Sequence, residues 1–333
     1  MDALGLLRMI DVNLIRNNPE LVRENLKRRN DPECLTLLDE FIDADKRWRA
    51  LQTELNEYRR KRNELGFKIA AKKKQGLDVS DLLKEADEIQ KQVHQLSVKV
   101  EEYRKRSREI LMRIPNLLHE SVPFGKDEND NIVLRSWGDI PQFDFTPAPH
   151  WDLGEALDII DFSRGVKLSG SRFYLLKGMG ALLQRALITF MLDIHVKEHG
   201  CTEIYPPYMV REECMIGSSN LPKFADNLYH DAEDDLWLVP TAEVPLTNVH
   251  RDEILEPGVL PINYVAYSAC FRREKMAAGK DTRGIKRGHQ FDKVELYKFT
   301  EPNDSFDALE RMLSEACLLY TSPSPRDLST SRM

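Results

Sequence analysis

Two long stretches in the first third of the chain repeat apolar residues at alternating steps of three and four. The first series runs Phe41, Ala44, Trp48, Leu51, Leu55, Tyr58, Leu65 and Ile69, interrupted only at Arg62. The second runs Leu82, Ala86, Ile89, Val93, Leu96, Val100, Tyr103 and Ile110, with Ser107 as its one polar member. Such alternation forms the seam of a coiled coil, so the pattern predicts two long helices that pack against each other.

A short break at residues 72–80 separates the two series. Gly76 fits the position just after one helix, and Ser80 fits the N-cap of the next. Pro115 ends the second helix. The pattern predicts an antiparallel hairpin whose arms reach roughly 40 Å, at about 1.5 Å per residue. Before it, residues 11–29 predict one small capping helix, with Asn18-Pro19-Glu20 as its start.

The pattern changes after the hairpin. A proline-rich linker leads to an amphipathic stretch, Met179 to Lys197, which predicts a helix. Strand candidates follow at residues 203–205, 236–239, 263–272 and 290–299, and a further helix begins near Ser305. Short strands without regular crossover helices favour an antiparallel sheet, and hence an α+β fold.

Charge distinguishes the outgoing helix of the hairpin from the rest of the chain. The whole chain has a net charge of −7, but residues 46–74 hold eleven Lys or Arg against three Glu. The cations concentrate in Arg59, Arg60, Lys61 and Arg62, and in Lys72, Lys73 and Lys74 at the tip. A basic stripe on a projecting helix is typical of contact with a nucleic-acid backbone. From the charges alone, a solvated coiled-coil surface is an equally good interpretation.

Composition argues against several other classes of protein. The five cysteines include no CxxC pair, which favours reduced thiols over a disulfide framework or a zinc site. The sequence has no run of about 18 apolar residues, so no membrane span is predicted. The apolar stretch at the N-terminus is too short for a secretory signal. There is no Walker loop, no GxGxxG after a strand and no HExxH.

The two longest strand candidates carry many charges. Strand alternation puts Arg272 and Glu274 on one face of the first, with Arg273 opposite. On the second strand, one face holds Arg287, His289, Phe291, Lys293 and Glu295. A purine triphosphate suits such a surface, because arginines bind phosphates, an aromatic ring stacks on the base and carboxylates accept from amines. An exposed, salt-bridged sheet face is the alternative.

These segments carry a family resemblance. Residues 271–274 and 282–295 resemble the second signature motif of class II aminoacyl-tRNA synthetases in its seryl form. Residues 200–207 resemble the first motif, whose proline (here Pro207) lies at the dimer interface, and residues 240–246 resemble the serine-pocket strand of seryl-tRNA synthetases. Residues 149–155 and 170–174 are also similar to that family, and the resemblance extends from about Ile10 to Glu315.

The resemblance implies a cytoplasmic, homodimeric enzyme that activates L-serine with ATP and Mg²⁺ and transfers it to tRNA(Ser). It implies a tRNA-binding helical arm at residues 1–115, which would use the seven basic residues named above. A partial catalytic domain at residues 116–317 would have the class II antiparallel sheet flanked by helices. Within it, the resemblance implies catalytic roles for Arg272 and Glu274, with Arg283 as a further phosphate contact. The other implied site residues are Arg272, Arg273, Glu274, Arg287, Gly288 and Phe291 for ATP, and Thr241, Ala242, Glu243 and Glu295 for serine. No metal ligand is assigned.

Two features depart from the family pattern. Residues 217–220, Gly-Ser-Ser-Asn, stand where the family has a Gly-Thr-Gly-Gln loop. The third signature motif is not found, and the Ser-, Pro- and Arg-rich residues 318–333 are expected to be a non-native tail rather than a genuine disordered one. We therefore expect an inactive or impaired fragment. The alternatives are a tRNA-binding or regulatory paralogue without aminoacylation, and a coiled-coil scaffold.

Overall fold

A computed structural model of the protein describes residues 10–125, 127–136, 142–275 and 283–321. The chain divides into two compact units, one built from residues 8–139 and the other mainly from residues 140–333. Each unit is described by itself below. The predicted motif position Thr282 lies outside the described residues. Of the tail predicted at residues 318–333, residues 318–321 form the end of a helix that extends from Ser305 to Thr321, and the rest lies outside the described residues.

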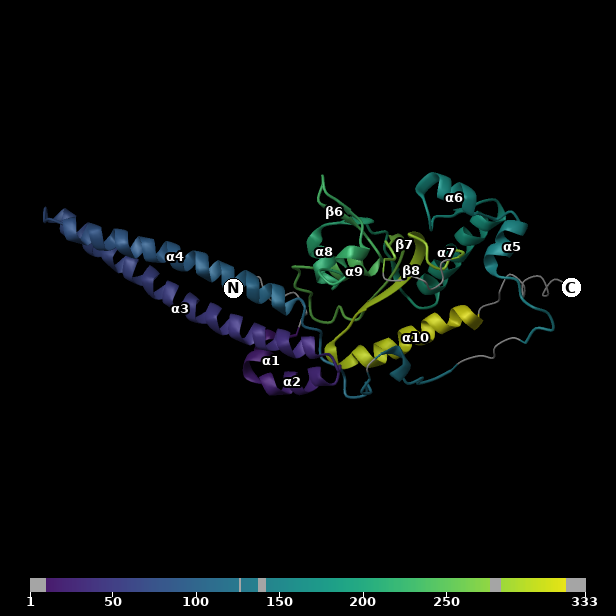
Figure 1. The fold of residues 1–333 in the computed structure, drawn as a ribbon, viewed down its shortest axis with the longest axis horizontal. Helices are drawn as coiled ribbons and strands as arrows, with labels where there is room; N and C mark the ends of the chain where they lie inside the picture. Colours follow the sequence, from purple (N-terminus) through teal and green to yellow (C-terminus); the bar gives the residue numbers. More distant parts are fainter. Residues whose placement is uncertain (1–9, 126, 137–141, 276–282, 322–333) are drawn as a thin grey trace. The chain divides into compact units, whose positions relative to one another are not determined.

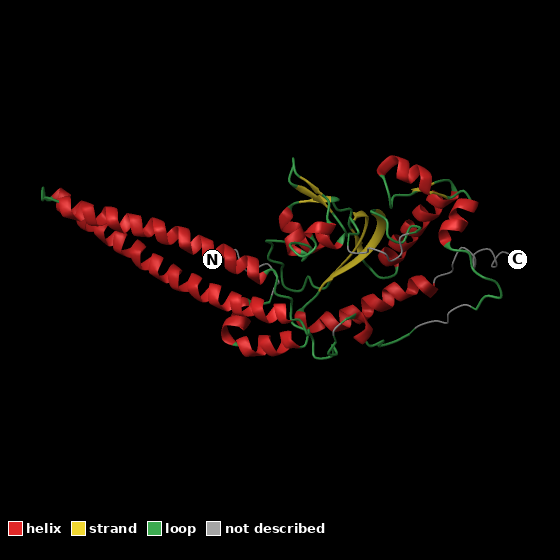
Figure 2. Ribbon diagram, viewed as in Figure 1, coloured by secondary structure: helices red, strands yellow, loops and turns green. Residues whose placement is uncertain are grey.

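The N-terminal unit is helical (Figures 1 and 2). Its helices are α1 (Val12–Asn17), α2 (Pro19–Lys27), α3 (Pro32–Lys74) and α4 (Ser80–Leu111). The prediction of a single capping helix before the hairpin is wrong, since α1 and α2 are separate. Asn18 lies between them with φ −138° and ψ 59°, because a residue that precedes proline is disfavoured in the helical region.

The predicted seams form the contact between α3 and α4, which confirms the antiparallel hairpin. Leu55, Val93, Leu96 and Val100 are buried there, and Trp48, Leu51, Tyr58 and Ile89 pack against them. At the base of the hairpin, Phe41, Ala44 and Ile110 join the core of α1 and α2. The hairpin therefore buries the side chains that the alternating pattern selects.

The hairpin turn is closed by backbone hydrogen bonds. Gly76 has φ +71°, and its N–H donates to the carbonyl of Lys73 at 3.1 Å. The next N–H, of Leu77, donates to Lys72 at 3.1 Å, which completes a Schellman motif around Gly76 as predicted. Ser80 is not the N-cap. It is the first residue of α4, and the side chain of Asp78 accepts from its N–H at 3.0 Å and from its hydroxyl at 2.6 Å.

The C-terminal unit combines helices with three small sheets (Figure 2). Its helices are α5 (His150–Ala156), α6 (Phe162–Ser169), α7 (Met179–Lys197), α8 (Glu212–Gly217), α9 (Glu243–Asn248) and α10 (Ser305–Thr321). One sheet pairs β1 (Ile160–Asp161) with β2 (Leu175–Leu176), and a second has the order β4 (Met209–Val210), β6 (Leu236–Leu238), β5 (His230–Asp231). The third has the order β3 (Thr202–Glu203), β7 (Ile262–Phe271), β8 (Gln290–Phe299). The α+β class is confirmed, although β3 runs parallel to β7.

The β7–β8 hairpin separates two environments. Its register pairs Ala266 with Glu295, Ser268 with Lys293 and Cys270 with Phe291, so these side chains share one face. Ala242 and Leu246 pack on this face against Ala266. On the other face, Asp292 accepts hydrogen bonds from Gln184 of α7 and from the hydroxyl of Tyr267. Helix α7 therefore covers the face opposite to Lys293 and Glu295.

Helix α7 keeps much of its apolar surface open. Leu182, Leu183 and Leu187 are 43–45% exposed. Among the described residues, α7 is also the one helix long and apolar enough by length and composition to cross a membrane. That is weak evidence for a span, because α7 belongs to a folded unit and contacts β7 and β8.

Candidate active site

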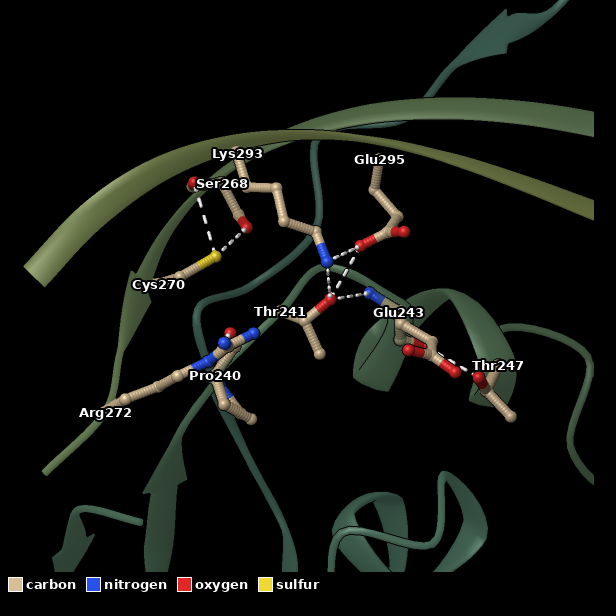
Figure 3. A network of polar contacts seen from close by, with 9 residues as sticks. All are labelled: Pro240, Thr241, Glu243, Thr247, Ser268, Cys270, Arg272, Lys293 and Glu295. Carbon is tan, nitrogen blue, oxygen red and sulfur yellow. Dashed lines mark hydrogen bonds and ion pairs between the residues drawn. The ribbon is translucent and has the colours of Figure 1, made fainter. Parts of the chain in front are cut away.

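A compact polar cluster lies where the β7–β8 hairpin meets the start of α9 (Figure 3). The hydroxyl of Thr241 donates to Oε2 of Glu295 at 2.6 Å, and Nζ of Lys293 donates to the same hydroxyl at 2.8 Å. Nζ of Lys293 also lies 2.5 Å from Oε2 of Glu295. Three side chains from two separate segments thus form one closed triangle of polar contacts.

Local backbone structure fixes Thr241 in this triangle. Its hydroxyl also accepts from the N–H of Glu243 at 3.2 Å, at the first residue of α9. The family resemblance implies a strand here, but the chain forms a loop that leads into this helix. Pro245 is compatible with the first helical turn, where its missing N–H would have had no intrahelical partner.

The neighbours of Thr241 differ in what they expose. Ala242 is fully buried, backbone included, and packs against Ala266. Glu243 as a residue is exposed to solvent. Protein groups around its carboxyl nevertheless withdraw it partly from water, which raises its pKa, and nearby Glu295 raises that pKa further. Lys293 acts in the opposite direction and lowers the pKa of Glu243. The site thus brings two carboxylates within electrostatic reach of one ammonium group.

Arg272 lies beside this cluster at the end of β7. Its Nε donates to the carbonyl of Pro240 at 3.2 Å (Figure 3). Its guanidinium carbon lies 5.0 Å from the centre of the Phe291 ring. Cys270 is fully buried between this arginine and Ser268, and burial raises the pKa of its thiol. Arg272 and Phe291 are therefore brought together as the sequence predicts.

The prediction that Arg272 and Glu274 share a strand face is wrong. β7 ends at Phe271, and Glu274 has φ +48°, so the chain has left the extended conformation. Glu274 is nevertheless 8% exposed, with its carboxylate 3.4 Å from Nη1 of Arg287, and its backbone carbonyl accepts from Arg172 at 3.1 Å. Arg287 itself precedes β8, which begins at Gln290.

Arg273 and Arg283 contact aromatic rings. Arg273 lies 4.4 Å from the ring centre of Tyr229 and donates to the carbonyl of Leu228 at 2.8 Å. Arg283 lies 5.8 Å from the ring centre of Trp151. Tyr229 and Trp151 were not among the predicted site residues, although the segment that holds Trp151 belongs to the resemblance.

The chain before β8 has a structural role. Nδ1–H of His289 donates to the carbonyl of Arg272 at 3.0 Å, while the His289 N–H donates to the carbonyl of Arg172 at 3.1 Å. A Cβ added at Gly288 would lie 3.0 Å from both the Gln290 carbonyl and the Tyr174 ring. This tight packing leaves room only for glycine without a shift of its neighbours.

Besides Tyr229 and Trp151, sequence reasoning did not identify Lys293 and Arg172 as site residues. Strand alternation puts Lys293 on the same face as Phe291 and Glu295. Alternation predicts the face of a side chain but not which residues it contacts. Arg172 has φ +62° and lies 102 residues from its partner Glu274, so local sequence patterns give no sign of their contact. Its position within the family-like segment 170–174 was the one signal in the sequence.

The remaining candidates lie elsewhere. Arg59, Arg60 and Lys61 are exposed on α3, Arg62 is half-buried, and Lys72, Lys73 and Lys74 are exposed at its end. Pro207 is exposed after β3. A hollow of about 550 Å³ along α7 is lined partly by Leu182, Phe190 and Ile194, away from the polar cluster. Among the described residues, no group of three or more His, Cys, Asp or Glu is placed to hold a metal ion.

Comparisons with known proteins agree over both units. Residues 9–118 match the family model of the seryl-tRNA synthetase N-terminal domain, and residues 224–326 match that of the tRNA synthetase class II core domain (G, H, P, S and T). A serine–tRNA ligase from Dehalococcoides mccartyi strain 195 is 56% identical over 308 residues, which cover 92% of this chain and 72% of that protein. One from Roseiflexus sp. strain RS-1 is 52% identical over 313 residues, with the same coverage. The crystal structure of seryl-tRNA synthetase from Pyrococcus horikoshii complexed with ATP superimposes with a TM-score of 0.82 at 40% identity, covering 95% of this chain and 75% of that one.

Proposed function

This chain belongs to the seryl-tRNA synthetase family, and we propose that its site activates L-serine with ATP and passes the serine to tRNA(Ser). The observation that carries the proposal is the cluster of Thr241, Lys293 and Glu295 beside Arg272. It combines carboxylates for an ammonium group with a guanidinium for a phosphate or carboxylate, as an amino acid and a nucleotide together require.

In the activation step, a carboxylate oxygen of serine attacks the α-phosphorus of ATP. The bond from that phosphorus to the oxygen bridging to the β-phosphate breaks, so pyrophosphate leaves and seryl-adenylate forms. Arg272 would hold both the α-phosphate and the serine carboxylate, and would stabilise the negative charge of the transition state. No protein nucleophile is required, because positioning and electrostatic stabilisation carry the step.

The adenine would stack on Phe291. The position of the Arg272 guanidinium near that ring supports this role, since the phosphate-binding group and the base platform adjoin. Glu274 would accept from the adenine amino group, and the backbone near Gly288 would contact the edge of the base. Arg287, which lies 3.4 Å from the Glu274 carboxylate, would add a phosphate contact, as would Arg273 and Arg283.

Serine would occupy the space beside Thr241, Glu243 and Glu295. A pocket built to hydrogen-bond a hydroxyl strongly rejects an analogue that lacks it, because buried polar groups then lose their partners. We therefore expect adenylate formation with alanine to be slower than with serine by at least about a hundredfold.

Serine-dependent exchange of pyrophosphate into ATP is the measurement that tests the proposal. It is made on an extended protein, in which residues 1–317 are followed by the C-terminal segment of the Dehalococcoides mccartyi relative. Exchange with alanine that approaches exchange with serine would contradict the pocket assignment. A protein that binds tRNA without any serine-dependent exchange would instead be a regulatory paralogue.

In the second step, a hydroxyl of the terminal tRNA ribose attacks the carbonyl carbon of seryl-adenylate, and AMP leaves. The exposed basic residues of α3 would bind tRNA phosphates during this transfer. Dimerisation through the first motif is supported by exposed Pro207, by Tyr205 at 81% exposure and by the open leucines of α7.

The described residues offer no ready metal site. We therefore propose that Mg²⁺ binds chiefly to the phosphates of ATP, which is its usual mode in nucleotide enzymes. Reduced cysteines and the role in translation fit a cytoplasmic location. The chain spans 72% of the length of the Dehalococcoides mccartyi relative. We further propose that the 333-residue chain is itself impaired, because the third signature motif is not found in its sequence.

A further inference from the structure

Lys293 lies at the centre of the polar cluster, although no role follows for it from the resemblance above. Its Nζ contacts the Thr241 hydroxyl at 2.8 Å and Oε2 of Glu295 at 2.5 Å. The same Oε2 accepts from Thr241, so one carboxylate oxygen is fully engaged within the protein. Among the described residues, no hydrogen bond reaches Oε1 of Glu295, which leaves that oxygen for a ligand.

We propose that Lys293 is a positioning residue for serine. Its ammonium group holds Thr241 and Glu295 in the arrangement that receives the amino acid, and it places a positive charge next to two neighbouring carboxylates. This inference rests on the proposed function, because it concerns the same serine pocket.

The geometry favours this role over an ordinary surface ion pair. Exposed pairs contribute little because water screens them and the side chains lose entropy. Here the side chains of Lys293 and Glu295 are 31% and 18% exposed, and Thr241 is 5% exposed. The ammonium group also bridges β8 and the loop before α9, so its loss would remove one of the two polar links between the segments that form the pocket and leave only the Thr241–Glu295 hydrogen bond.

Charge balance gives the second argument. The groups that face Lys293 are Glu295 on β8, Glu243 at the start of α9, and Cys270 and Arg272 at the end of β7. Two carboxylates, one ammonium and one guanidinium sum to zero, which matches a zwitterionic amino acid. Lys293 lowers the pKa of the Glu243 carboxyl, so without Lys293 that pKa would rise further.

The test compares Lys293→Met with Lys293→Arg in the extended protein, by pyrophosphate exchange between pH 5 and 9. For Lys293→Met we expect the KM for serine to rise at least about tenfold, with the KM for ATP changed less than about threefold. The acid limb of kcat/KM for serine should move upward by about one pH unit, since removal of an adjacent positive charge raises a carboxyl pKa. Lys293→Arg keeps the positive charge, so the acid limb of its kcat/KM for serine should lie at nearly the same pH as in the unsubstituted protein.

Lys298→Met is the matched control. Lys298 lies on the same strand and pairs with Glu315 of α10 at 2.8 Å, away from the cluster. It is expected to lower stability without moving the acid limb. The inference is overturned if the acid limb of kcat/KM does not move in Lys293→Met, or if the KM values for serine and for ATP rise equally. It is also overturned if Lys293→Arg behaves like Lys293→Met. Absence of exchange in the unsubstituted extended protein would contradict the proposed function, and this inference with it.

Discussion

A single hydroxyl organises the candidate serine pocket. The Thr241 hydroxyl donates to Glu295 and accepts from both Lys293 and the N–H of Glu243. Replacement by valine preserves the shape but leaves these buried partners unsatisfied, which typically costs about 1–3 kcal/mol. For Thr241→Val in the extended protein we expect the KM for serine in the exchange assay to rise about tenfold or more. Thr241→Ser retains the hydroxyl and should retain most of the affinity, so equal losses in both variants would contradict this role.

Glu243 links the pocket to pH-dependent stability. Partial burial and then Glu295 raise the pKa of its carboxyl, so the folded protein holds that proton more tightly than the unfolded chain does. Ionisation of Glu243 therefore costs folding free energy: the cost is absent in acid, grows once the pH passes the pKa of the unfolded chain, and is complete above the raised pKa of the folded protein. Glu243→Gln should thus raise the melting temperature at pH 8, and the gain should shrink toward pH 4.

A matched control accompanies that measurement. Glu256→Gln removes one exposed carboxylate from the same unit and so reproduces the change in net charge. A melting-temperature gain in Glu243→Gln that is equally large at pH 4 and pH 8, or that is matched by Glu256→Gln, would exclude the burial of the Glu243 charge as its cause.

At the scale of elements, alanine substitutions of two glycines, one in α3 and one in the turn after it, are expected to change the stability of the hairpin in opposite directions. Gly76 has φ +71° in the Schellman motif, where an alanine is strained, so Gly76→Ala should destabilise the hairpin by about 1 kcal/mol. Gly66 lies inside α3 with open space around an added Cβ, so Gly66→Ala should stabilise the hairpin by about 0.5–1 kcal/mol. Thermal melts followed by circular dichroism at 222 nm, the usual helix band, would measure both changes. Shifts of the same sign would contradict the assignment of the turn.

The basic stripe on α3 gives a prediction about tRNA. Replacing Arg59, Arg60, Lys61 and Arg62 with glutamine should weaken tRNA binding and reduce the slope of log K against log salt, because fewer counterions are released. Serine binding should be unaffected. The matched control neutralises four exposed cations of the returning helix: Lys99, Arg104, Lys105 and Arg106. If both fourfold variants lose affinity and slope equally, the effect is one of net charge and the stripe is only a solvated surface.

Long periodic elements were the predictable part of the fold. The expected bounds of α7 and β8 agree with the structure to the residue, because each has many positions that repeat one pattern. The two-residue strands β1, β2, β4 and β5 are too short to have a period, and strand alternation cannot indicate that β3 joins β7 in parallel. At the site, Arg272 and Phe291 followed from alternation, whereas the position of Glu274 did not, since the chain turns after Phe271.

For the whole molecule, the prediction concerns the 333-residue chain itself. Within the described residues, strand β8 pairs with β7 on one side and with no strand on the other, so its other edge is open. Open edges pair readily with other chains, and we expect this unit to aggregate or fold partially. The arm makes its contacts locally and should remain helical. The chain as given should therefore show helical circular dichroism but little serine-dependent exchange, and the extended protein should recover both solubility and exchange. Robust exchange by the 333-residue chain would refute the proposed impairment.

The ten-pair ladder between β7 and β8 also limits how such a site can change by insertion and deletion. Side chains alternate between faces, so removal of one residue within Gln290–Phe299 would turn Phe291 away from Arg272 and would bury charge against α7. The ends of the segment between the strands are placed by side-chain contacts instead, such as that of Glu274 with Arg287 and that of His289 with the carbonyl of Arg272. Among descendants of this sequence, the two paired strands can change by substitution but not by insertion or deletion of a residue.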